Sequence, residues 1–174
     1  MRPLSTRPPL ELLQPGRIHF GVGALGSCGS VLRGFGSRHV LVLHSNSVAA
    51  TISPMLDGLR TDHITLTILS GVPPEPDIAA FEKLRAATQG RPLDAVVAIG
   101  GGSVLDVAKL LAALHGNAAS VQTFFGQGLL PPRRVRLLCL PTTSGAGSEV
   151  SPNAILYDES DRLKKAVISP QLVP

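Results

Sequence analysis

The feature that most constrains the fold is a regular alternation of short apolar runs with segments whose apolar residues recur at helical spacing. The apolar runs predict four strands, at residues 39–43, 63–69, 94–99 and 135–140. Helical spacing between them predicts three helices, at residues 46–59, 78–88 and 103–116. Because the strands are apolar on both faces, we expect an α/β fold with a parallel sheet, helices on both of its faces and right-handed crossovers.

Local signals add detail to this frame. Residues 153–157 and 165–169 flank a charged turn and predict a β-hairpin. Residues 17–23 read as a short edge strand. Pro54 predicts a break or a fresh first turn inside the helical segment 46–59, and Asp77 is placed to cap the helix that follows it.

Composition limits the classes of function. The chain has 174 residues, a length that is enough for one domain with a core. Because 44% of the residues are hydrophobic and only 3% are aromatic, we expect this core to be aliphatic. We expect a Pro-rich arm at 1–16 and a single domain at 17–174. The net charge is +4, and the one basic cluster (Arg133, Arg134 and Arg136) lacks interleaved aromatic residues, so we expect no nucleic-acid partner.

Targeting and metal signals are weak in this sequence. The amino-terminal residues lack the apolar region of a signal peptide, and no apolar run reaches the ~18 residues of a membrane span, so we expect a cytoplasmic protein without a membrane partner. Cys28 and Cys139 lie far apart, and Cys139 reads as a small apolar core residue. The five histidines show no metal-ligand spacing.

A Gly-rich loop, Gly100–Gly102, follows the third predicted strand and precedes the clearest helix. Ser103 and Asp106 have the spacing of a capping box, which makes Ser103 the expected N-cap. Free amides at a helix start favour an anion, and glycines let a phosphate approach the backbone. The alternative is that the glycines only make a strand-to-helix turn.

A second polar loop, at residues 141–153, follows the fourth predicted strand. It supplies hydroxyl groups, two glycines and one acid, Glu149. Taken alone it reads as a surface loop. Since ligands bind beyond the carboxyl ends of parallel strands, two such loops at one sheet edge favour a shared ligand.

Together, the stretches GGGSVLDVAK and PTTSGAGSEVSPNAIL and the spacing to KKAVISPQLVP resemble the iron-containing alcohol dehydrogenase family, whose fold is shared with glycerol dehydrogenase and dehydroquinate synthase. The resemblance implies a Rossmann-like domain that binds NAD or NADP. It also implies a following all-helical domain, not included in this sequence, with one Asp and three His for a divalent metal such as iron or zinc. A small alcohol or aldehyde substrate and a homo-oligomer in the full-length protein are further implications.

The resemblance also assigns roles to residues of this chain. Carried over by motif position, the pyrophosphate is held by Gly101, Gly102 and Ser103, and the helix start is braced by Asp106 and Lys109. The cofactor cleft is lined by Thr142 and Thr143, and the far part of the dinucleotide is met by Asn153 and by Lys164 or, one register on, Lys165.

Two departures from the family pattern concern specificity. Ser45 stands where many relatives have an acid for the adenosine ribose, which favours acceptance of a 2′-phosphate and hence of NADP. Glu75 stands where relatives often have Asn before a proline. The resemblance implies that the full-length protein is an NAD(P)-dependent alcohol dehydrogenase. Without the metal domain, we expect this chain alone to be inactive. A maleylacetate-reductase-like or glycerol-dehydrogenase-like enzyme and a non-catalytic nucleotide-binding module are the alternatives.

Overall fold

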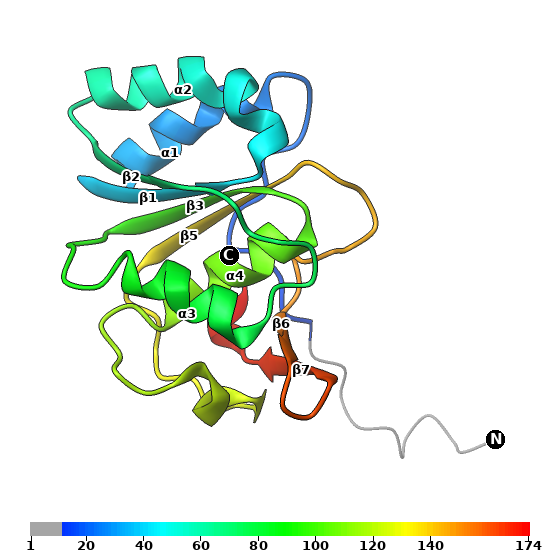
Figure 1. Cartoon of the computed structure of the whole chain (residues 1–174). Helices are drawn as coiled ribbons and strands as arrows, with labels where there is room; N and C mark the ends of the chain where they lie inside the picture. The colour runs from blue at the N-terminus through cyan, green and yellow to red at the C-terminus, as the bar shows by residue number, and fades with distance from the viewer. Residues whose placement is uncertain (1–11) are drawn as a thin grey trace, which may run out of the picture.

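The computed structural model describes residues 12–174 and contains two sheets (Figure 1). Sheet A is parallel, with the strand order β2-β1-β3-β5. Its strands are β1 (His39–His44), β2 (Thr65–Leu69), β3 (Ala95–Gly100) and β5 (Arg136–Pro141). The predicted α/β class and all four predicted strands of this sheet are confirmed.

Helices cover both faces of sheet A (Figure 1). On one face, α1 (Cys28–Gly34) and α2 (Ala49–Thr61) pack on Val40, Val42 and Val97. On the other face, α3 (Ile78–Ala86) and α4 (Gly102–Ala113) pack on Leu41, Leu43 and Val96. Successive strand residues point to opposite faces, so strands that are apolar throughout bury both faces at once.

Sheet B lies on the far side of α4 and has the strand order β4-β7-β6. The antiparallel hairpin of β6 (Asn153–Asp158) and β7 (Leu163–Ile168) was predicted from the sequence. The two-residue strand β4 (Gly126–Gln127), parallel to β7, was not. Because α4 is sandwiched between sheet A and β6, nearly all of its residues are buried.

Short 3-10 turns complete the chain, at η2 (Ala24–Ser27), η3 (Asn46–Val48), η4 (Val121–Phe124) and η5 (Pro170–Leu172). Asp77 caps α3 as predicted, since its carboxylate accepts a hydrogen bond of 2.6 Å from the Ala80 amide. The break predicted at Pro54 is wrong, because α2 continues through it. Within the described residues no helix has the length and apolar character that a bilayer crossing requires.

The edge strand predicted at 17–23 is also wrong. These residues pair with no strand of the described chain, and Ile18, Phe20 and Val22 are exposed. Alternation of apolar residues is a signal for a strand only where a sheet edge is within reach. Of the arm predicted at 1–16, residues 1–11 lie outside the described residues, and residues 12–16 have no regular structure.

Candidate functional site

The structure brings the two polar loops together at the carboxyl edge of sheet A. The amide of Thr142 donates to the carbonyl of Gly100 over 3.0 Å, which continues the pairing of β5 with β3. At the neighbouring strand, the Ser45 amide donates to the Ile99 carbonyl over 2.9 Å. Ser45 and the two loops therefore follow adjacent strands and share one edge, as the sequence predicts.

The three glycines are needed for close packing of the chain on itself. A Cβ at Gly100 would lie 2.7 Å from the Cβ of Val104, and one at Gly102 would lie 3.0 Å from the Cβ of Ala146. A Cβ at Gly101 would lie 3.2 Å from Thr143 Oγ1. None of the three glycines has a positive φ. Close packing against Val104 of α4 at Gly100, and against the second loop at Gly101 and Gly102, thus accounts for the triplet, and neither turn geometry nor a phosphate is required to explain it.

The helix start differs from the predicted capping box. The N-cap residue of α4 is Gly101 rather than Ser103, and no side chain caps the first turn. Gly102 and Ser103 are only half-buried. The first amides of a helix have no partner within the helix, so these backbone donors stay unpaired by side chains, and the helix dipole favours negative charge beside them.

Asp106, freed from capping, reaches across to the second loop and to sheet B. Its carboxylate accepts hydrogen bonds from Ser148 Oγ and, over 3.1 Å, from the Ile155 amide. Burial raises the pKa of this carboxyl group, and the bonds from Ser148 and the nearby Lys109 ammonium act in the opposite direction. Asp106 therefore ties α4 to the loop and to β6.

Lys109 is the main link between α4 and the second loop. Its side chain is fully buried, and its Nζ donates to the Asn153 carbonyl over 2.6 Å, to Ser151 Oγ over 3.2 Å and to Ser148 Oγ over 3.3 Å. Asp106 Oδ1 lies 4.0 Å from the ammonium. Burial lowers the pKa of this lysine, partly offset by the carboxylate. The sequence signal for this role was a lysine inside an otherwise apolar stretch of helix, although Ser151 as a partner could not be read from it.

The remaining predicted residues lie on exposed surfaces next to the contacts that Asp106 and Lys109 make. Thr142 and Thr143 are exposed on the second loop. Asn153 and Lys164 lie on the same face of the β6–β7 hairpin, because Asn153 pairs with Ile168 and Lys164 with Tyr157.

Lys165, the alternative to Lys164, points to the opposite face and forms ion pairs with Asp158 and Asp161. The hairpin therefore separates the two lysines, and only Lys164 shares a face with Asn153.

Cys139, expected in the core, is half-buried on β5, and burial raises its thiol pKa to about 12, so it is not a reactive group at neutral pH.

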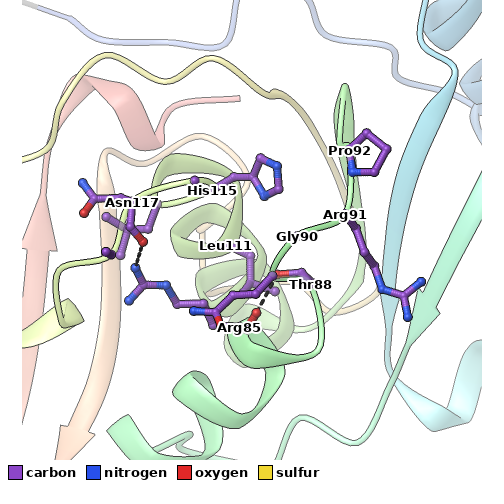
Figure 2. Close-up of a pocket in the computed structure, with 12 residues that line it drawn as sticks. Arg85, Thr88, Gly90, Arg91, Pro92, Leu111, His115 and Asn117 are labelled. Atoms are coloured by element: carbon purple, nitrogen blue, oxygen red, sulfur yellow. Dashed lines mark hydrogen bonds between the residues drawn. The ribbon is translucent and has the colours of Figure 1, made fainter.

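A hollow lies elsewhere, at the other end of α4 (Figure 2). It has a volume of about 570 Å³ and is lined by residues that follow α3 and α4, including Arg91 and His115. Arg85 at its side is almost fully buried and donates to the carbonyls of Asn117 and, over 2.8 Å, Ala119. This hollow contains none of the predicted site residues, and its most buried cation is already bonded.

Comparison with known proteins identifies the family of this chain. The sequence profile of the family described as "Iron-containing alcohol dehydrogenase" matches residues 15–174. The chain belongs to the iron-containing alcohol dehydrogenase family.

Two curated relatives agree with this assignment, and a solved structure shares the fold. The chain is 30% identical to long-chain-alcohol dehydrogenase 1 of Geobacillus thermodenitrificans, over 93% of this chain and 45% of the relative. It is 32% identical to the probable alcohol dehydrogenase EutG of Salmonella typhimurium, over 88% of this chain and 40% of the relative. Its fold superposes on the sulfoacetaldehyde reductase of Bifidobacterium kashiwanohense, solved with NAD+, with a TM-score of 0.85, 24% identity and coverage of 97% of this chain and 45% of that one. This iron-containing alcohol dehydrogenase domain thus spans less than half of the curated relatives that it matches.

Proposed function

We propose that this domain binds NAD or NADP and forms the dinucleotide half of an alcohol dehydrogenase or aldehyde reductase that acts on a small alcohol or aldehyde. One observation carries the proposal: the uncapped first turn of α4 faces a loop of exposed hydroxyl groups at the carboxyl edge of a parallel sheet. Family membership and the NAD+ in the sulfoacetaldehyde reductase structure support it. When bound, the nicotinamide supplies the hydride acceptor or donor.

The residues of this chain bind and orient the dinucleotide. The amides of Gly102 and Ser103 donate to the pyrophosphate, where the helix dipole also favours negative charge. Thr142 and Thr143 line the cleft beside it, and Asn153 and Lys164 contact the cofactor along the hairpin. Asp106 and Lys109 fix the second loop against α4, so the binding surface is formed before the ligand arrives.

A metal is not assigned to this part of the protein. Within residues 12–174, no group of three or more His, Cys, Asp or Glu side chains could hold a metal ion. We therefore propose that the divalent metal, iron or zinc, belongs to the full-length protein, and that residues 1–174 alone oxidise no simple alcohol whatever divalent metal is added. The full-length protein is proposed to be a cytoplasmic homo-oligomer.

Titration calorimetry of residues 1–174 with NADH and with NADPH tests the proposed function. Because Ser45 puts no negative charge at the end of β1, we expect both dinucleotides to bind, with dissociation constants within about tenfold of each other. Ser45→Asp should weaken NADPH binding by more than tenfold, since like charges at close range repel by at least ~1 kcal/mol even in water and more near a protein surface.

The matched control is Ser53→Asp, which adds the same charge at an exposed position of α2. It should leave the affinity for both dinucleotides unchanged. Absence of binding by either dinucleotide at millimolar concentration would refute the proposed function, and strong selectivity of the unmodified protein for NADH would refute the role of Ser45.

A further inference from the structure

The loop between β2 and α3 starts at the same edge of sheet A and is fastened to the hairpin. The Tyr157 amide of β6 donates to the Pro76 carbonyl over 2.9 Å, and Asp77 forms an isolated parallel bridge with Tyr157. This connection places the loop along the edge of β6 that faces away from β7, and the side chain of Glu75, the residue before Pro76, meets Lys164 of β7. The loop therefore borders the hairpin face that carries Asn153.

Glu75 forms an ion pair with Lys164, which is the largely exposed lysine among the three of α4 and the hairpin. Glu75 Oε1 lies 2.5 Å from Lys164 Nζ, and the two side chains are 67% and 57% exposed. Of the other two lysines of α4 and the hairpin, Lys109 is fully buried and Lys165 is paired with two aspartates. An anion on this face of the hairpin therefore meets the Lys164 ammonium together with a carboxylate.

The backbone at Glu75 has a conformation that is unfavourable for this residue type. Glu75 has a φ of +51°, in the left-handed region that Asn adopts several-fold more readily than Glu. It also precedes Pro76, and residues before proline favour extended conformations. A residue kept in such a conformation is a reason to look for a function.

We propose that Glu75 competes with the dinucleotide for Lys164 and thereby sets a weaker, readily reversible affinity. This inference rests on the proposed function, because it takes the pyrophosphate-containing ligand to be the anion that reaches Lys164. Binding requires the carboxylate to release the ammonium, and the released carboxylate then repels the phosphates. Since an exposed ion pair contributes at most about 1 kcal/mol, the effect is about twofold to fivefold in affinity.

A double-mutant cycle measured by calorimetry with NADH tests the competition. Glu75→Gln should bind NADH about twofold to fivefold more tightly than the unmodified protein, and Lys164→Gln should bind it more weakly. In the Lys164→Gln background, the gain from Glu75→Gln should be smaller. The matched control is Asp57→Asn, which removes a similarly exposed pair with Arg60 on α2 and should leave the affinity unchanged.

Thermal unfolding separates charge from backbone strain. Glu75→Asn should raise the melting temperature by about 2–4 °C because Asn tolerates the left-handed conformation, whereas Glu75→Gln should not. Both variants should tighten NADH binding to the same extent, because both remove the charge.

The outcomes distinguish this inference from the proposed function. If the unmodified protein binds NADH and Glu75→Gln binds it no more tightly, or if affinity follows melting temperature rather than charge, the competition is refuted while the dinucleotide site stands. If no variant binds NADH at millimolar concentration, the proposed function fails and the competition fails with it.

Discussion

The two ends of α4 differ in what they leave open to a ligand. The amino end has an uncapped first turn and faces a loop of exposed hydroxyl groups. The carboxyl end borders the hollow of about 570 Å³ (Figure 2), but its buried Arg85 is already bonded to backbone carbonyls. The sign of the helix dipole also differs, since only the amino end favours an anion. Unpaired donors, rather than volume, therefore identify the candidate site in this fold.

Loss of the buried lysine at the amino end should have the largest effect. Lys109→Met leaves three acceptors and the Asp106 carboxylate without their cation, and breaking a buried charged pair costs about 3–5 kcal/mol of unfolding free energy. We expect urea denaturation to show this loss, and calorimetry to show no NADH binding because the second loop is released.

The control for that variant is Lys83→Met on the exposed surface of α3, which should change stability by less than about 0.5 kcal/mol. A Lys109→Met protein that is as stable as the unmodified one and binds NADH normally would show that neither the stability nor the binding surface at the amino end of α4 depends on the Lys109 contacts.

A methyl group in the glycine triplet should have the next largest effect. Gly100→Ala places a Cβ 2.7 Å from the Cβ of Val104, so the start of α4 has to shift, at a cost of about 1–3 kcal/mol. Gly58→Ala in α2 is the control, because no atom lies within 4 Å of the added Cβ and helix propensity favours Ala there by about 0.5–1 kcal/mol. Equal effects of the two changes on urea denaturation would contradict the close-packing explanation.

Acid sensitivity should come from the hairpin, which contacts α4 through Asp106 and Lys109. The bond from Lys165 lowers the pKa of Asp158 to about 2, from 3.8. A depressed acid pKa stabilises the fold above the unfolded-state value and loses that stabilisation as the pH falls towards the folded-state value. The melting temperature of the unmodified protein should therefore drop more steeply between pH 5 and about pH 2 than that of Asp158→Asn.

Asp57→Asn, at an exposed pair remote from the hairpin, is the control for this measurement. If it flattens the acid profile as much as Asp158→Asn does, the acid sensitivity does not come from the hairpin.

The smallest effect is expected at the carboxyl end of α4. Burial lowers the pKa of His115, so its ring is neutral at physiological pH and offers no charge to a phosphate. His115→Ala should leave the NADH dissociation constant within about twofold of the unmodified value in calorimetry. A tenfold weakening would mean that the hollow, and not the uncapped helix start, holds the ligand.

The sequence predicts the sheet and the location of the site better than it predicts the contacts. Apolar runs such as 94–99 locate the strands within a residue or two, as β3 (Ala95–Gly100) shows, because burial on both faces leaves a plain pattern. The Ser103 and Asp106 spacing could not reveal that Asp106 bonds Ser148, because a three-residue interval suits both a cap and a side chain that points away to a distant loop. Strand β4 was missed because two residues carry no periodicity, and its pairing with β7 is distant in sequence.

The complete burial of Lys109 has a consequence for chemical labelling. An amine-acylating reagent reacts with accessible, deprotonated lysines, so the exposed Lys164 should be modified readily while Lys109, with no exposed side-chain surface, is protected in the folded protein. Modification of Lys109 requires the 141–153 segment to separate from α4. The rate at which its peptide gains the label therefore reports how often that segment opens, and ligands that hold the segment closed should slow the labelling.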